Sequence, residues 1–465
     1  MQVFARNHEF NLAYHALAFV VLVGALIVVL IVIVRWLKEE KIDIAYHPLW
    51  TIVYTYPYSS LLRIRPSVLQ ADNEGQFVGI VAPGTLHSIF LVKRQWFRSS
   101  GRLELRVLHP ETLQVLVTGG SGFLGTGIVS ALLEKYPKWR ISILDHRPPD
   151  PQVANRLDQI LSADIRVAES VHRAFINYTP DLVVHTAGVI PAGTKRYSRK
   201  EEDWLRVKAV NYDGTRHILD AALASGCKLF VYTSSCTVVT DDMEHDYFYM
   251  DEKIPTGLAT LHYGKSKGMA ERYVLSPEHA GKGLVACALR PCTIIGPTDT
   301  AVISRFHEVI MNGETNFLVG DGNNLYDFMY IDNAVLAHIL AVENLLTTQT
   351  AAGHVFFISN QEPMYFWDFL AYVWAQFDHV PNYRVHIPET LAWAVASVLE
   401  CKTWLTGTAS ALDRGSVRDG ARSLFANNDK AKRILGYEPK VGLSEGVKLT
   451  CMVYAELQTC RRGVC

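Results

Sequence analysis

The sequence predicts an α/β protein built around a doubly wound, parallel β-sheet of the Rossmann type. An apolar run enters a glycine-rich turn that opens directly into a helical pattern, in "LQVLVTGGSGFLGTGIVSALLEKY" at 113–136. Further continuous apolar runs follow at 140–145, 181–188, 228–235 and 284–291, with helical stretches between them. Such runs are typical of parallel strands, because helices cover both faces of a parallel sheet.

The glycine turn predicts a dinucleotide site. Gly119, Gly122 and Gly125 let the backbone approach a pyrophosphate, whose charge would meet the free N–H groups and positive dipole end of the following helix. The next strand, "RISILD", ends at Asp145, where a carboxylate would bind the adenosine ribose hydroxyls and disfavour a 2′-phosphate. Arg147 lies two residues further on and would suit that phosphate. We therefore predict NAD as the cofactor, with NADP as the alternative.

A tyrosine and a lysine four residues apart suggest the reaction. Tyr263 and Lys267 share one face of a predicted helix within "LHYGKSKGMAERYV". Oxidation of a secondary alcohol needs a base for the hydroxyl proton, and the ordinary pKa of a phenol, near 10, is too high at neutral pH. A nearby ammonium and an oxidised nicotinamide would lower that pKa. Ser235, at the end of "KLFVYTSS", would hold the substrate oxygen.

Composition narrows the choice of function. The 465 residues suffice for two or three domains, and a formal net charge of −1 gives no electrostatic argument for binding nucleic acid. The eight cysteines are scattered without a Cys-x-x-Cys pair, so neither a disulfide framework nor a zinc site is expected. No other ligand set predicts a metal.

Several motifs carry a family resemblance. In order along the chain, "VTGGSGFLG", "VVHTAG", "VYTSS", "YGKSK" and "LRPCTIIGP" resemble the extended short-chain dehydrogenases/reductases. Residues 318–345, 364–374, 399–407 and 431–447 are similar to the 3β-hydroxysteroid dehydrogenase family, and most like its fungal and animal decarboxylating sterol-4α-carboxylate 3-dehydrogenases. The resemblance spans residues 114–450. It departs from the family after Ser235, where the usual Tyr-Gly is missing, which leaves the substrate contacts there open.

The resemblance implies roles for the matching positions. Asn211 would support the helix or a proton relay, although by itself it reads as a structural cap. The implied catalytic residues are Ser235, Tyr263 and Lys267. The implied cofactor-binding residues are Gly119, Gly122, Phe123, Leu124, Gly125, Asp145, Asp164, Ile165, Ala187, Gly188, Asn211, Tyr263, Lys267 and Pro291.

The reaction implied by the resemblance is oxidation of a sterol 3β-hydroxyl to a 3-ketone with NAD(P). If the sterol carries a 4α-carboxylate, the product is a β-keto acid that loses carbon dioxide. A 3β-hydroxy-Δ5-steroid dehydrogenase/isomerase or a triterpenoid-tailoring dehydrogenase would use the same residues. A regulatory protein that senses NAD(P) without turnover is the alternative of another class, although such proteins have usually lost the tyrosine–lysine pair.

The N-terminal part predicts a membrane anchor. Residues 12–34 form an apolar run of 23 residues, long enough to cross the roughly 30 Å hydrocarbon core as a helix. The cations Arg35, Lys38 and Lys41 on its C-terminal side outnumber Arg6 on the other, so the catalytic part should face the cytosol. With a sterol substrate we expect the endoplasmic reticulum, together with a homodimer and sterol-demethylation partners as open expectations.

The expected organisation has four parts. An anchor at 1–40 precedes a linker or membrane-interface extension at 41–113, an NAD(P)-binding domain at 114–295 and a substrate-binding lobe at 296–465. Within the lobe, residues 387–407 are apolar nearly all round. We expect a buried helix there, with a helix lying in the membrane surface near the sterol entrance as the alternative.

Overall fold

A seven-stranded parallel sheet organises the structure, a computed structural model that describes residues 94–99, 102–107, 111–299, 301–406 and 412–461. Its strand order is β14-β9-β7-β6-β3-β4-β5, and every neighbouring pair is parallel. The strands are β3 (Gln114–Thr118), β4 (Arg140–Asp145), β5 (Ile160–Ser162), β6 (Leu182–His185), β7 (Leu229–Thr233), β9 (Val285–Pro291) and β14 (Val355–Ile358). The five strands predicted from apolar runs are confirmed.

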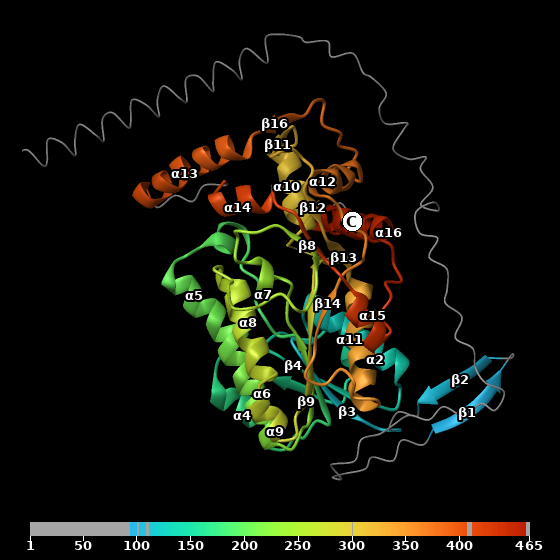
Figure 1. Cartoon of the computed structure of the whole chain (residues 1–465). Coiled ribbons are helices and arrows are strands. Elements are labelled where there is room, and N and C mark those ends of the chain that lie inside the picture. Colours follow the sequence, from blue (N-terminus) through green and yellow to red (C-terminus); the bar gives the residue numbers. More distant parts are fainter. Residues whose placement is uncertain (1–93, 100–101, 108–110, 300, 407–411, 462–465) are drawn as a thin grey trace, which may run out of the picture. The chain divides into compact units, whose positions relative to one another are not determined.

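Helices cover both faces of this sheet (Figure 1). One face carries α2 (Phe123–Lys135), α11 (Ile331–Leu346) and α15 (Asp429–Leu435), and the other carries α4 (Ala168–Phe175), α6 (Gly214–Ala224) and α8 (His262–Val274). Successive residues of β3 supply both cores: Val115 and Val117 pack with the first group and Leu116 with the second. This alternation follows from the period of two along a strand, and it explains why the strand sequence is apolar throughout.

The strand order reverses at β3, which pairs with β4 on one side and β6 on the other. In open α/β sheets ligands bind at such a switch point, outside the carboxyl ends of the strands. The doubly wound fold is thus confirmed. A ligand site is expected among the residues that follow β3, β4, β6 and β7.

A second group of elements forms a lobe around its own aromatic core. Helices α10 (Ile303–Met311), α12 (Phe366–Ala375) and α16 (Leu443–Arg461) share this core with β10 (Thr293–Ile295) and β13 (Phe328–Tyr330). A four-stranded sheet lies in the order β15-β12-β17-β8, made of Met364–Tyr365, Leu325–Tyr326, Leu424–Ala426 and Tyr247–Met250. A further parallel pair joins β11 (Phe317–Val319) to β16 (Val385–Ile387).

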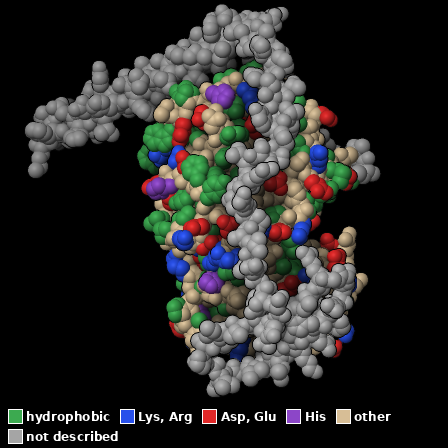
Figure 2. Space-filling model, turned by 45° about the vertical axis from the view of Figure 1, so that its right-hand side comes forward, with side chains coloured by type: hydrophobic (Ala, Val, Ile, Leu, Met, Phe, Trp, Pro, Cys, Tyr) green, Lys and Arg blue, Asp and Glu red, His purple; other side chains and the backbone are tan. Residues whose placement is uncertain are grey.

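The two parts exchange elements across the expected division at residue 295. Strand β14 and helix α11 come from the second half of the chain but complete the nucleotide-binding sheet and its cover. Strand β8 comes from the first half but joins the lobe sheet. Acidic and basic side chains are interspersed over the face seen in Figure 2, in keeping with the near-neutral net charge.

The predicted anchor at 12–34 and most of the extension at 41–113 lie outside the described residues. Within that extension, β1 (Arg94–Ser99) and β2 (Arg102–Val107) pair as an antiparallel hairpin. Among the residues that the structure describes, none of the helices combines the length and apolar character needed to cross a membrane.

Candidate active site

The glycine turn between β3 and α2 is built by close backbone contacts. Gly119 adopts a φ of +69°, which favours glycine, and its carbonyl oxygen accepts a 2.9 Å hydrogen bond from the Gly122 N–H. A Cβ on Gly125 would lie 2.1 Å from that same oxygen, and a Cβ on Gly119 would lie 2.8 Å from the backbone of Ala187. Side chains are thus excluded from a turn that leads directly into the N-terminus of α2. These residues fit a dinucleotide whose pyrophosphate lies against bare backbone.

Both a carboxylate and a guanidinium reach this turn. Asp145, the last residue of β4, accepts hydrogen bonds from the main-chain N–H groups of Ser121 (3.2 Å) and Arg147 (3.0 Å). The Arg147 Nε lies 3.6 Å from the Asp145 Oδ1. A Cβ on Gly122 would lie 3.5 Å from the Arg147 Nη2. The residues predicted to discriminate NAD from NADP are therefore adjacent, and their positions are compatible with either cofactor.

The predicted adenine-flanking residues follow the next strand. Ser162 of β5 pairs with Asp145 of β4, so Asp164 and Ile165 lie one strand further from the switch point. The hydrogen bond from Arg166 is the main reason that the pKa of Asp164 lies below its usual range. Ile165 is buried against Gly214 of α6, where a Cβ would come within 2.7 Å of its side chain. Phe123 and Leu124 begin α2 and pack against the first core.

The strand ends on the other side of the switch point bring the remaining predicted residues together. A Cβ on Gly188, after β6, would lie 3.2 Å from the Asn211 Oδ1 and 3.7 Å from the Lys267 Nζ. Pro291, at the end of β9, accepts a 3.1 Å hydrogen bond from the Cys236 N–H through its carbonyl oxygen. Cys236 directly follows Ser235, so the ends of β7 and β9 meet beside the candidate catalytic group.

Tyr263 and Ser235 are both buried. Tyr263 lies in the first turn of α8 and is 9% exposed, and Ser235 is 7% exposed. Burial raises the pKa of Tyr263, and a hydrogen bond with Ser235 opposes that rise. The Ser235 Oγ also accepts hydrogen bonds from the Thr237 N–H (3.2 Å) and hydroxyl (2.9 Å). Thr237 therefore fixes the position of the serine hydroxyl.

Lys267 lies one turn along α8 and points toward β7. Its Nζ donates a 2.5 Å hydrogen bond to the Thr233 carbonyl oxygen and lies 4.5 Å from the centre of the Tyr232 ring. Burial lowers its pKa from 10.5 to about 7, while the charge of Glu271 acts in the opposite direction. At physiological pH the Lys267 amine is therefore protonated in part of the molecules and neutral in the rest. A small change in nearby charge shifts this equilibrium.

Asn211 does not cap a helix, which is the role expected of an asparagine judged by itself. It lies in a π-helical turn, Ala209–Asp213, between α5 (Glu201–Lys208) and α6. Its side chain accepts from the Val189 N–H (2.8 Å) and donates to the Val189 carbonyl oxygen (3.0 Å) and the Ser266 Oγ (3.1 Å). It thus ties the loop after β6 to α8. Single π-turns are frequent at functional sites.

His185 is a buried residue that the sequence did not single out. Its Nδ1 lies 2.6 Å from the Thr118 hydroxyl and its Nε2 lies 2.9 Å from the Thr215 hydroxyl. Burial lowers its pKa to about 3, so the ring is neutral. It joins the glycine-turn strand to α6. A single histidine at the end of an apolar run carries no pattern that would have revealed this.

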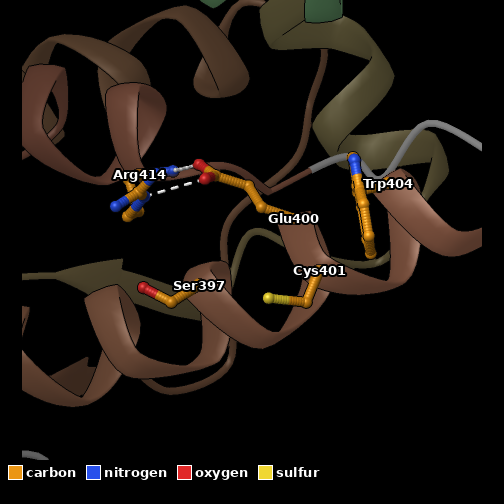
Figure 3. Close-up of a pocket in the computed structure, with 5 residues that line it drawn as sticks. All are labelled: Ser397, Glu400, Cys401, Trp404 and Arg414. Atoms are coloured by element: carbon orange, nitrogen blue, oxygen red, sulfur yellow. Dashed lines mark hydrogen bonds and ion pairs between the residues drawn. The ribbon is translucent and has the colours of Figure 1, made fainter.

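The expectation of a buried helix at 387–407 is wrong. Helix α13 (Glu389–Thr406) buries only Ala392 and Ala396, and it leaves Trp393, Trp404 and Leu405 at 50%, 84% and 73% exposure. A cavity of 290 Å³ lies beside it, lined by Ser397, Glu400, Cys401, Trp404 and Arg414 (Figure 3). The Arg414 Nε pairs with the Glu400 Oε2 at 2.8 Å along its edge. None of the predicted site residues lines this cavity.

Comparisons with known proteins agree with this fold. A model of the 3-beta hydroxysteroid dehydrogenase/isomerase family matches residues 116–389. The chain is 33% identical over 337 residues to the decarboxylating sterol-4-alpha-carboxylate 3-dehydrogenase erg26 of Schizosaccharomyces pombe, covering 71% of this chain and 94% of that protein. It is 30% identical over 346 residues to the enzyme of that name from Saccharomyces cerevisiae, covering 72% and 96%.

Solved structures with a similar fold include two sugar-nucleotide epimerases. The UDP-glucose 4-epimerase of Thermotoga maritima, solved with UDP-glucose, is 25% identical with a TM-score of 0.56 over 74% of this chain and 99% of that chain. The UDP-glucose 4-epimerase of Thermus thermophilus, solved with NAD, is 24% identical with a TM-score of 0.56 over 73% and 98%. By its sequence match, this chain belongs to the 3-beta hydroxysteroid dehydrogenase/isomerase family.

Proposed function

We propose that this chain oxidises the 3β-hydroxyl of a 4α-carboxysterol to a 3-ketone and that carbon dioxide then leaves C4. The observation that carries the proposal is the burial of Tyr263, Lys267 and Ser235 where β7 ends, with the Lys267 Nζ bonded to the Thr233 carbonyl oxygen, at the same sheet edge as the glycine turn. The substrate class rests on relatives named as decarboxylating sterol-4-alpha-carboxylate 3-dehydrogenases.

Each residue has its own role in the proposed oxidation. A bound NAD(P) would accept the hydride that leaves C3 of the sterol. Tyr263, as phenolate, takes the proton of the 3-hydroxyl, and Ser235 donates a hydrogen bond to the substrate oxygen. Because burial raises the pKa of Tyr263, the phenolate needs positive charge nearby. Lys267, in its ammonium form one helical turn away, supplies part of that charge.

Decarboxylation needs no further group on the protein. Once C3 is a ketone, the bond from C4 to the carboxylate breaks, and its electron pair is delocalised into the C3 oxygen as an enolate. The enolate then takes a proton at C4 from solvent. Ser235 can stabilise the negative oxygen through the same hydrogen bond that held the alcohol.

Cofactor choice and substrate are tested together. We expect the purified full chain in detergent to release labelled carbon dioxide from a 4α-carboxysterol, with NAD preferred to NADP because Asp145 would bind the ribose hydroxyls. Ketone formation without carbon dioxide, or turnover of a Δ5-steroid or a triterpenoid alone, would favour the related dehydrogenases. Binding of NADH without any turnover would favour the sensing protein.

We propose further that the chain is anchored in the endoplasmic reticulum membrane by residues 12–34, with its catalytic part in the cytosol. A sterol dissolves in lipid, so an anchored enzyme meets its substrate at the membrane surface. The exposed tryptophans and leucine of α13 suit the boundary between headgroups and acyl chains. Other enzymes of sterol demethylation on the same membrane, and a second copy of this chain, are the proposed partners.

Two measurements test this location. The full chain should stay with microsomes after alkaline carbonate extraction, and protease added outside sealed microsomes should digest its catalytic part. In vesicles, brominated lipids should quench the full chain less after Trp393 and Trp404 are both replaced by Phe. The matched control is Trp374→Phe, because Trp374 is 2% exposed. Release by carbonate would contradict the anchor, and equal quenching would contradict the role of α13.

A further inference from the structure

Asp241 holds the first turn of the helix that carries Tyr263. It is fully buried and directly follows α7 (Thr237–Thr240). Its Oδ2 accepts a 2.8 Å hydrogen bond from the Gly264 N–H, and its carbonyl oxygen accepts from the N–H groups of Thr260 (2.8 Å) and Leu261 (3.2 Å). Leu261, the residue before α8, provides no side-chain cap. A carboxylate from another segment thus satisfies a free N–H at this helix start.

Arg196 holds that carboxylate from the opposite side. It lies in the 3₁₀ turn Gly193–Tyr197 and donates from Nη1 to the Asp241 Oδ2 (3.1 Å) and from Nη2 to the Oδ1 (2.5 Å). Such bidentate pairing fixes geometry as well as charge. The Arg196 side chain is 18% exposed and the Asp241 side chain is fully buried. The pair therefore lies at the edge of the buried region around Tyr263.

The contact between Gly264 and Asp241 leaves no room for a side chain at position 264. A Cβ on Gly264 would lie 2.2 Å from the Thr237 carbonyl oxygen and 2.7 Å from the Asp241 Oδ2. The residue next to Tyr263 therefore has to be glycine for Asp241 to reach the backbone of α8. Displacing the carboxylate would displace the turn that carries the phenol.

We propose that Asp241 and Arg196 are a positioning pair, which fixes the first turn of α8 and places one negative and one positive charge beside Tyr263. This inference rests on the proposed role of Tyr263 as the base. Burial is the largest cause that raises the pKa of Tyr263, and among the charged groups Asp241 raises that pKa and Arg196 lowers it.

Other titratable and charged groups that face the phenol or the pair come from several elements. Cys236 raises the pKa of Tyr263, and the hydrogen bond with Ser235 lowers it. Around Asp241 and Arg196, the negative charge of Asp419 raises the pKa of both groups. The groups that face Tyr263 or the pair are Tyr232, Ser235, Cys236, Lys267, Tyr197, Asp419 and Arg422.

The test compares the pH dependence of sterol oxidation in three variants. The rate rises with pH as the base ionises, so its apparent pKa reports the ionisation of Tyr263 together with its charged neighbours. Asp241→Asn removes a negative charge, so this rise should move to lower pH by roughly one unit. Arg196→Met removes a positive charge and should move it to higher pH by roughly the same amount. Arg196→Lys keeps the charge and should restore the wild-type position, with kcat lowered because the bidentate contact is lost.

The control is Asp242→Asn, because Asp242 is a buried neighbour whose carboxylate binds His245 and Tyr247 rather than the backbone of α8. Its pH profile should match the wild type. Thermal unfolding and NADH binding of each variant show whether it has folded. If Asp241→Asn does not fold, Arg196→Met and Arg196→Lys still decide the question. A profile that stays in place in Arg196→Met, or that moves the same way in both charge-removing variants, would overturn the inference. A wild-type enzyme that oxidises no sterol would instead refute the proposed function.

Discussion

Helices α8 and α13 reverse the usual relation between sequence and burial. Helix α8, "HYGKSKGMAERYV", carries mainly polar residues, yet eight of its 13 residues are buried, including Lys267 and Glu271. Helix α13, "ETLAWAVASVLECKTWLT", is mainly apolar, yet only Ala392 and Ala396 of its 18 residues are buried. Hydrophobic burial would favour the opposite arrangement.

The buried polar helix is stabilised by partners. Glu271 accepts hydrogen bonds from Arg290 (2.6 and 2.9 Å) and from Ser234 (2.7 Å), and Lys267 donates to a carbonyl oxygen. Breaking such a buried pair costs several kcal/mol, although the pair itself adds little stability over apolar residues. A polar helix in this place therefore indicates function. An apolar helix left at the surface equally indicates a function, such as contact with lipid.

The largest expected effect is at the phenol of α8. Tyr263→Phe removes the proposed base and should lower kcat for sterol oxidation by about 10³-fold, the middle of the range for general-base catalysis. NADH binding, measured by fluorescence titration, should remain. Tyr273→Phe is the matched control, since that tyrosine lies on the same helix but donates to the exposed Asp220 at 2.6 Å. Unchanged turnover in Tyr263→Phe would remove the functional reason for burying α8.

The second prediction separates activity from stability at Lys267. Lys267→Met should lower kcat by about 10²-fold, while raising the midpoint of urea unfolding at pH 7 because a desolvated cation is removed. Since the folded pKa is about 7 and the ordinary value is 10.5, the unfolded chain binds more protons over this window. Wild-type stability should therefore rise with pH from about 7 to 10.5, and the advantage of the variant should shrink.

Lys265→Met provides the control for that experiment. Lys265 lies on the same helix but is exposed, with its Nζ 4.5 Å from the centre of the Trp204 ring. It should change neither kcat nor the pH dependence of unfolding. A Lys267→Met protein that is less stable than the wild type at pH 7 would show that the buried ammonium stabilises α8.

The last prediction concerns α13 and uses two aspartates on one helix. Ala396→Asp places a charge at a fully buried position beside Val417 and should lower the free energy of unfolding by about 3 kcal/mol or more. Trp404→Asp, at an 84% exposed position, should change it by less than about 0.5 kcal/mol. Urea titration of both proteins checks the difference. Equal losses would mean that the outer face of α13 is covered in solution.

The sequence could predict the parts of the site that are local. Strand, glycine turn and helix are contiguous, so the position of Gly119 at the end of β3 followed from spacing. The shared helical face of Tyr263 and Lys267 followed from a separation of four residues, and the helix itself is confirmed. Asp145 at a strand end was likewise readable.

Contacts between distant segments could not be predicted in this way. Asp241 meets Arg196 across 45 residues and Gly264 across 23, and neither separation carries a periodic signal. The last strand of the sheet, β14, comes from the half of the chain assigned to the substrate lobe.

By itself the sequence determined the Rossmann architecture, the location of the nucleotide turn and the tyrosine–lysine helix, because each depends on neighbours along the chain. Only the tertiary structure decided that Asp241 joins Arg196 to the first turn of α8 and that α13 lies exposed. The physical reason is that burial and charge pairing depend on which segments pack together. A helical pattern specifies an apolar surface, but it cannot specify what covers that surface.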